Sequence, residues 1–209
     1  NFKDKLLNMG TDVAVDDANK SDSYILINPA RAGLILEGSS INDLTGIQAF
    51  TSLQYLYLNG NNLTSLNLSG LTNLRYLDCR YNNLTSLNLS ANTQLAQIWC
   101  NNNPNLASLV LPANTSTLWG VWCYGGKLTT LNLNGNTNIT DLFCQSNQLT
   151  ALSLAPYIKL AQINCSTNKF ATVNLNANPL LVSVWCFSNT LLTDLYIQNG
   201  FNTNIVNSG

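Results

Sequence analysis

Apolar residues recur at fixed intervals along most of the chain, separated by Asn, Ser and Thr. The segment 74–89 has the form L-x-x-L-x-C-x-x-N-x-L-x-x-L-x-L, and the same form returns at 139–154. Its first position is filled by Leu53, Leu74, Leu95, Leu118, Ile139, Leu160 and Leu181, at steps of 21, 21, 23, 21, 21 and 21 residues, after a degenerate copy at 34–50. A period of this length predicts a solenoid of stacked repeats.

Each part of the repeat predicts a structural element. The alternating L-x-C segment predicts a strand whose Leu and Cys point inward, and the second alternating segment, such as 63–68, predicts a short strand on the opposite side. The Asn that closes the first strand can bond to the backbone of the turn, and stacked copies predict an Asn ladder. Its members are Asn61, Asn82, Asn103, Asn147, Asn168 and Asn189. Gly126 interrupts this series, so we expect a local irregularity there, near the two extra residues of the longer step.

The pattern resembles the leucine-rich repeat, L-x-x-L-x-L-x-x-N-x-L, with Cys at the third apolar position. Its Cys-bearing form with Asn-Asn-Leu-Thr-Ser-Leu-Asn-Leu-Ser (82–90), together with the entry segment 41–50, resembles surface proteins of Bacteroidetes-type bacteria. The resemblance implies a non-enzymatic binding protein that is exported to the outer cell surface or the extracellular space. It also implies a lipid anchor or a C-terminal sorting domain elsewhere in a larger chain or complex.

We therefore predict a leucine-rich-repeat solenoid of about seven to eight repeats, with a parallel inner sheet, a second short-strand face opposite and a short N-terminal capping helix. The expected divisions are an N-terminal cap at 1–33, the repeat array at 34–197 and a tail or incomplete cap at 198–209. Residues 1–10 predict the amphipathic capping helix. The Asp-rich loop that follows lacks the spacing and the Gly of a calcium loop, which favours a solvated loop, although calcium binding stays open. Because the chain begins with Asn1 and shows no leader, we expect a mature or excised piece.

The cysteines share one inward repeat position. Cys79, Cys100, Cys123, Cys144, Cys165 and Cys186 are predicted to form a ladder of thiols about 4.8 Å apart, the spacing of neighbouring strands. Their Cβ atoms would run side by side, which is poor disulfide geometry, so we interpret them as small buried apolar side chains.

Composition excludes several classes of function. Only 9% of the residues are charged and the net charge is -1, so no basic surface for nucleic acid is expected. No apolar run approaches the roughly 18 residues of a membrane span. The chain has no histidine, which removes His-based triads and His-bearing metal sites, and its acidic residues are scattered. We expect neither an enzyme nor a bound cofactor or metal.

Aromatic residues concentrate at the outward positions of the first strand. We expect this face to bind a ligand, because the repeat itself does not require rings there and exposed apolar patches mark interaction sites. The predicted contact residues are Tyr55, Tyr57, Tyr76, Asp78, Arg80, Gln97, Trp99, Trp119, Trp122, Tyr124, Asp141, Phe143, Trp185 and Phe187. The alternative is that aromatic residues favour strands and stabilise a parallel sheet through their neighbours.

Four functions fit such a face. We expect the ring-bearing strands to dock a protein partner, because Trp, Tyr and Arg dominate hot spots of protein interfaces. They could instead bind a neutral polysaccharide, with rings as stacking platforms and amides and carboxylates bonding hydroxyls. A structural spacer within a larger adhesin is a third reading. Binding to ice or a mineral is the fourth, since Thr64, Thr85, Thr129, Thr150 and Thr193 form a partial row that Ala107 and Ala171 interrupt.

Overall fold

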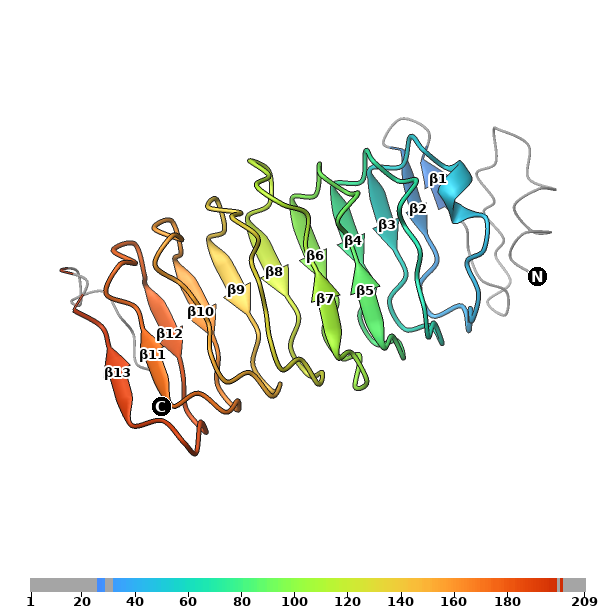
Figure 1. Cartoon of the computed structure of the whole chain (residues 1–209). Helices are drawn as coiled ribbons and strands as arrows, with labels where there is room; N and C mark the ends of the chain where they lie inside the picture. The colour runs from blue at the N-terminus through green and yellow to red at the C-terminus, as the bar shows by residue number, and fades with distance from the viewer. Residues whose placement is uncertain (1–25, 29–31, 199, 201–209) are drawn as a thin grey trace.

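The computed structural model describes residues 26–28, 32–198 and 200, and it shows a right-to-left stack of similar coils in the view of Figure 1. Nine three-residue strands form one sheet in the order β1-β2-β3-β4-β6-β8-β9-β10-β12. They are β1 (Leu26–Asn28), β2 (Gly33–Ile35), β3 (Tyr55–Tyr57), β4 (Tyr76–Asp78), β6 (Gln97–Trp99), β8 (Gly120–Trp122), β9 (Asp141–Phe143), β10 (Gln162–Asn164) and β12 (Ser183–Trp185). Only β1 runs antiparallel to its neighbour; every later pair is parallel. The predicted leucine-rich-repeat solenoid is thereby confirmed.

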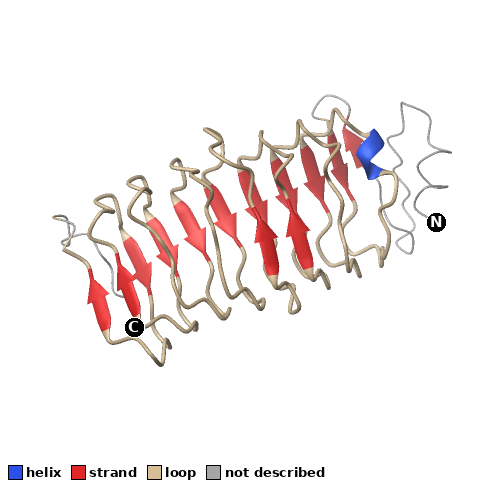
Figure 2. Cartoon of the chain, in the orientation of Figure 1, coloured by secondary structure: helices blue, strands red, loops and turns tan. Residues whose placement is uncertain are grey.

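The opposite side of the stack carries two shorter sheets and one isolated bridge. Strand β5 (Ser86–Asn88) pairs with β7 (Ser108–Val110), β11 (Thr172–Asn174) pairs with β13 (Asp194–Tyr196), and an isolated bridge joins Asn67 to Asn88. Figure 2 shows these strands in a separate layer from the long sheet, with turns joining the two layers. Within the described residues, the segments 128–133 and 149–154 contain no strand, so the predicted second face is interrupted rather than continuous.

The only described helix is η1 (Ile47–Ala49), a single 3-10 turn in the entry coil. The predicted capping helix at 1–10, the Asp-rich loop and most of the tail at 198–209 lie outside the described residues.

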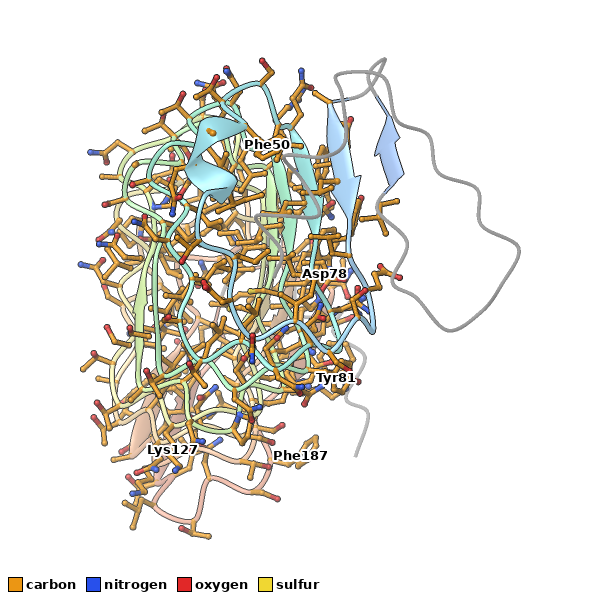
Figure 3. All side chains as sticks on the ribbon, turned by 90° about the vertical axis from the view of Figure 1, so that its right-hand side faces the viewer. Phe50, Asp78, Tyr81, Lys127 and Phe187 are labelled. Carbon is orange, nitrogen blue, oxygen red and sulfur yellow. The ribbon has the colours of Figure 1, made fainter. Side chains whose placement is uncertain are left out.

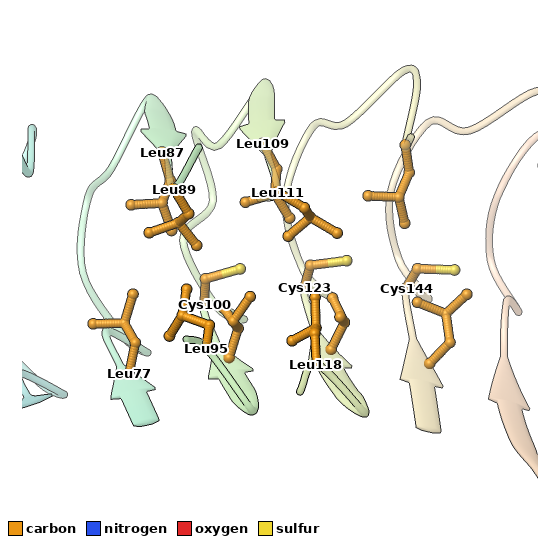
Figure 4. Close-up of a cluster of buried hydrophobic side chains, with 14 of the residues drawn as sticks. Leu77, Leu87, Leu89, Leu95, Cys100, Leu109, Leu111, Leu118, Cys123 and Cys144 are labelled. Atoms are coloured by element: carbon orange, nitrogen blue, oxygen red, sulfur yellow. The ribbon is translucent and has the colours of Figure 1, made fainter. Parts of the chain in front are cut away.

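The core is one continuous cluster that runs the length of the stack. Leu56, Leu77, Ile98, Val121, Leu142, Ile163 and Val184, the middle residues of the long sheet, are all buried. The thiols of the cysteine series lie in the same cluster, except Cys186, which is half-buried, and all six are free. Cys100, Cys123 and Cys144 stand side by side with their sulfur atoms pointing the same way (Figure 4). This confirms the predicted thiol ladder.

The predicted Asn ladder is present, and Asn82 shows how it works. Its Nδ2 donates to the carbonyl oxygens of Leu58 and Cys79 at 2.9 and 3.2 Å, and its Oδ1 accepts the Leu63 amide at 3.0 Å. One buried side chain thus joins two coils and satisfies backbone groups that no strand pairs. Asn103, Asn147 and Asn168 repeat the arrangement.

The gap at Gly126 is compensated by the preceding insertion. Leu63 and Leu84 donate their amides to the ladder Asn of the next coil, but Gly126 offers Leu106 no such acceptor. Instead the Leu106 amide donates to the Asn103 carbonyl at 2.9 Å, within its own turn. The extra residue at 103–106 lengthens that turn so that this bond closes. The irregularity at Gly126 was predicted, but the bond between Leu106 and Asn103 that compensates for it was not.

A second Asn ladder was not predicted. Asn92, Asn136 and Asn178 are fully buried, and each donates Nδ2 to two carbonyl oxygens at 2.7–3.0 Å. Each lies three residues before the residue that begins the next repeat, a spacing that could have revealed them. They stabilise the turn on the far side of the coil.

Candidate binding face

Strand alternation places the first and third residues of each strand of the long sheet outward. We call this outward surface the ring face. Its third-residue row consists of Tyr57, Asp78, Trp99, Trp122, Phe143, Asn164 and Trp185, in register across seven strands. Viewed along the stack, Asp78, Tyr81 and Phe187 lie on the side of this sheet (Figure 3). The structure therefore brings the predicted contact residues together on one surface.

Four rings of that row form a continuous stack. The centroids of Trp99 and Trp122 are 5.3 Å apart with planes 19° from parallel, and those of Trp122 and Phe143 are 5.8 Å apart at 10°. Trp185 approaches Phe143 to 6.2 Å although Asn164 separates them in the row, so these two rings lean across Asn164. A smaller stack joins Tyr55 to Tyr76 at 4.9 Å.

The stacking geometry determines which part of each ring a partner can reach. Near-parallel rings on neighbouring strands, about 4.8 Å apart, turn their faces toward one another in an offset stack at these centroid distances. The two faces of Trp122 are therefore turned toward Trp99 on one side and Phe143 on the other, and its edge points outward for contact. Trp119 differs: it meets Trp122 edge-on at 6.1 Å and 85°, and it is 37% exposed.

Gly120 makes room for Trp122. A Cβ placed on Gly120 would lie 2.6 Å from the Trp122 Cη2 atom, too close for any carbon contact. The indole thus folds back over its own strand, into the space where neighbouring strands carry Gln97 and Asp141. Gly120 therefore contributes to the ring face by leaving space for the Trp122 indole.

Asp78 was expected among the contact residues, but it is only 3% exposed. Arg80 holds its carboxylate through Nε at 2.9 Å and Nη2 at 2.7 Å. The bond to Asp78 raises the pKa of Arg80, and burial, with Tyr55 and Asp78, raises the pKa of Tyr57. Asp78 can therefore reach a ligand only through Arg80, whose side chain is 38% exposed.

The other predicted contact residues are accessible to different degrees. Phe187 is 48% exposed, whereas Trp99, Tyr124, Gln97 and Asp141 are half-buried. Asp141 accepts a bond from the Thr140 hydroxyl at 2.5 Å. Over the described residues, this surface consists of rings, amides, the Asp78–Arg80 ion pair and the Asp141 carboxylate, so it carries little net charge.

A row of amides lies beside the rings; Asn101 and Gln145 were predicted as polar groups among the rings, but their missing hydrogen-bond partners were not. Asn59, Asn101 and Gln145 follow β3, β6 and β9 at the outward position after the buried Leu or Cys. Buried polar atoms without a hydrogen-bond partner occur in each: Oδ1 of Asn59, both amide atoms of Asn101 and Oε1 of Gln145. The abundance of Asn in the chain hid them, because a bonded and an unbonded Asn look the same in a sequence.

The described residues lack two other kinds of functional feature. No group of three or more His, Cys, Asp or Glu side chains there is placed to hold a metal ion. None of the described helical residues forms a segment that could cross a membrane.

No protein-family model matches the chain, and no curated protein sequence matches it. Solved structures do. Internalin C2 of Listeria monocytogenes is 22% identical, with a TM-score of 0.62 over 79% of each chain. A leucine-rich-repeat protein of Leptospira interrogans is 17% identical, with a TM-score of 0.54 over 97% of this chain and 67% of that one. The functional domain of InlJ from Listeria monocytogenes, described as including a cysteine ladder, is 24% identical with a TM-score of 0.42 over 79% of this chain. The chain spans about half of that domain, 53%. The similarities to internalin C2 and to the Leptospira protein establish the fold, which is that of bacterial leucine-rich-repeat proteins.

Proposed function

We propose that this chain is a non-enzymatic binding module, displayed at or released from a bacterial surface, whose ring face docks a protein partner. The observation that carries the proposal is the stack of Trp99, Trp122, Phe143 and Trp185 on a surface that the core does not need. Large, rigid rings beside an Arg are the side chains that dominate protein interfaces. The stack holds them in place before binding, which lowers the entropy lost on association.

Ring orientation favours a protein over a polysaccharide. Sugars pack their C–H faces against the faces of aromatic rings, and the faces of Trp122 are turned toward its stacked neighbours Trp99 and Phe143. Ring edges and the clefts between rows instead suit apolar side chains of a protein. Trp119, perpendicular to the stack, is the ring best placed to retain a glycan contact.

The deciding experiment compares two double variants on arrays of purified extracellular protein domains and of glycans. Trp99→Ala with Trp122→Ala removes the centre of the stack. Ser108→Ala with Val110→Ala alters exposed residues of β7 on the opposite face and is the matched control. We expect protein signals that the wild type and the control share and that the ring variant loses at least 10-fold, with both variants folded by circular dichroism.

Two results would contradict the proposal. Protein signals that persist in the ring variant would place binding elsewhere and favour a spacer role for this face. A glycan signal that depends on the rings, with no such protein signal, would establish the polysaccharide alternative.

A further inference from the structure

The amide row beside the rings contains buried polar atoms without hydrogen-bond partners, which lower the stability of the folded chain. Asn101 is 1% exposed, and neither its Oδ1 nor its Nδ2 has a partner. An unpaired buried amide costs about 1–3 kcal/mol. Asn82 and Asn103 make three or more bonds each, and Asn92, whose Oδ1 also lacks a partner, still donates its Nδ2 to two carbonyls. Among the buried Asn side chains of the described residues, Asn101 alone leaves both amide atoms unpaired. The exception at Asn101 indicates groups reserved for a ligand.

The spacing of the row selects the ligand's conformation. Asn59, Asn101 and Gln145 follow alternate strands, with β4 between the first two and β8 between the last two. Two strand spacings correspond to about 9.5 Å. A polyproline II helix repeats every three residues, about 9.3 Å, whereas an extended strand repeats every two residues, about 6.7 Å. Only the first period matches the row.

The unpaired atoms select the ligand's chemistry. Asn59 and Gln145 leave acceptor oxygens, and Asn101 leaves both an acceptor and a donor. A polyproline II segment has no internal hydrogen bonds, so its carbonyls are free, and every non-proline residue supplies an N–H. Prolines at two positions of three, with an N–H at the third, would present donors at the spacing of these acceptors.

The adjoining side chains form the walls of the site. Arg80 and Tyr124 flank Asn101 in the row, and Trp99, Trp122 and Phe143 form the next row. Aromatic-lined grooves are the established surroundings of polyproline II ligands. Arg80, which Asp78 holds, and Tyr124 are partly exposed side chains beside Asn101, so a ligand reaches the Asn101 amide only if one of them turns aside. The Asp78–Arg80 pair leaves the strip without net charge, which suits a neutral segment.

We infer that the strip between the ring stack and the amide row binds a neutral, proline-rich segment of a partner protein in the polyproline II conformation, lying along the solenoid axis. The N–H group of every third residue donates to Asn59, Asn101 and Gln145, while a carbonyl accepts from Asn101. This inference rests on the proposed function, because it uses the same face.

The test titrates the intact chain with a peptide of about five Pro-Pro-Gln units, followed by tryptophan fluorescence and calorimetry. An all-proline peptide of the same length keeps the conformation but lacks donors. A Gly-Gly-Gln repeat keeps the donors but lacks the conformation. We expect saturable binding of the first peptide with a dissociation constant below about 1 mM, and binding at least 10-fold weaker for the other two.

Asn101→Leu separates a ligand role from a structural one. Because it removes unpaired amide atoms, we expect its thermal midpoint to equal or exceed that of the wild type, while peptide affinity falls at least 10-fold. Ser108→Ala is the control that leaves both unchanged. No saturable binding up to about 2 mM, equal binding of the all-proline peptide, or a destabilised Asn101→Leu variant each overturns the inference. If ring-dependent protein capture survives in Asn101→Leu, the proposed function stands without it; if capture never depends on the rings, the proposed function fails by its own test.

Discussion

At the scale of single residues, the hydrogen-bond partners of an Asn amide decide its role. An amide bonded to the backbone stabilises the stack, whereas an unpaired amide can bind a ligand. The first ladder was predictable because its members recur with the repeat and precede a turn whose backbone needs partners. The second ladder also keeps a fixed place in the repeat and could have been found in the same way. The missing partners of the amide row could not, since they depend on which groups face these side chains after the coils stack. The same reason explains Asp78, whose outward position in the pattern gave no sign that Arg80 would cover it.

Replacing Asn82 by Ala tests whether the first Asn ladder stabilises the stack of coils. The change removes bonds to the Leu58 and Cys79 carbonyls and to the Leu63 amide. The two carbonyls still accept from Asn61 and Asn103, but the Leu63 amide is left buried without a partner. We expect a loss of about 2–4 kcal/mol in the free energy of unfolding, measured by urea denaturation. Asn83→Ala, at an exposed neighbour, is expected to change stability by no more than about 0.5 kcal/mol. Equal effects of the two substitutions would show that the ladder does not stabilise the stack.

At the scale of elements, the strands of the long sheet were predicted well and the arrangement of their rings was not. Period-two alternation fixes which residues face outward, so the ring face follows from the sequence. Whether rings lie flat or cover one another depends on rotamers and on space left by neighbours. Gly120 shows this: its missing Cβ, and no property of Trp122 itself, allows the indole to fold back into the stack.

Gly120→Ala should therefore disturb the ring stack while preserving the fold. Its Cβ would displace the Trp122 indole, so we expect the near-ultraviolet circular dichroism of the Trp99–Trp122 pair to diminish and partner affinity to fall several-fold. The free energy of unfolding should change by less than about 1 kcal/mol, because alanine suits a strand better than glycine. Gly33→Ala is the matched control in β2, at the same sheet position, where the new Cβ would lie 3.5 Å from Tyr55 Cβ, an ordinary contact. An unchanged dichroism spectrum in Gly120→Ala would refute this account of the stack.

At the scale of the whole molecule, the thiol ladder couples the stability of the array to pH. Burial raises the pKa of Cys165 to about 12, and it raises those of Cys100, Cys123 and Cys144 well above the ordinary value. The folded chain therefore keeps these thiols protonated at pH values where an unfolded chain releases their protons. The repeat period predicted the ladder. Because all its buried members lie in one continuous core, each adds to the same dependence of stability on pH.

We expect stability to be unaffected by the thiols below about pH 8.5, where both states hold these protons, and to fall as pH rises further. Each buried thiol then contributes a slope of about -1.4 kcal/mol per pH unit until its folded pKa is reached. Urea midpoints between about pH 7.5 and 10, under reducing conditions, measure this slope. Cys100→Ala with Cys123→Ala should lower the slope by the share of two thiols, whatever it does to stability at neutral pH.

In the folded wild type near pH 8, an alkylating reagent should modify the half-buried Cys186 before any other cysteine. Midpoints that stay constant to about pH 10, or rapid alkylation of Cys100, would mean that water reaches the ladder, which a continuous core does not allow.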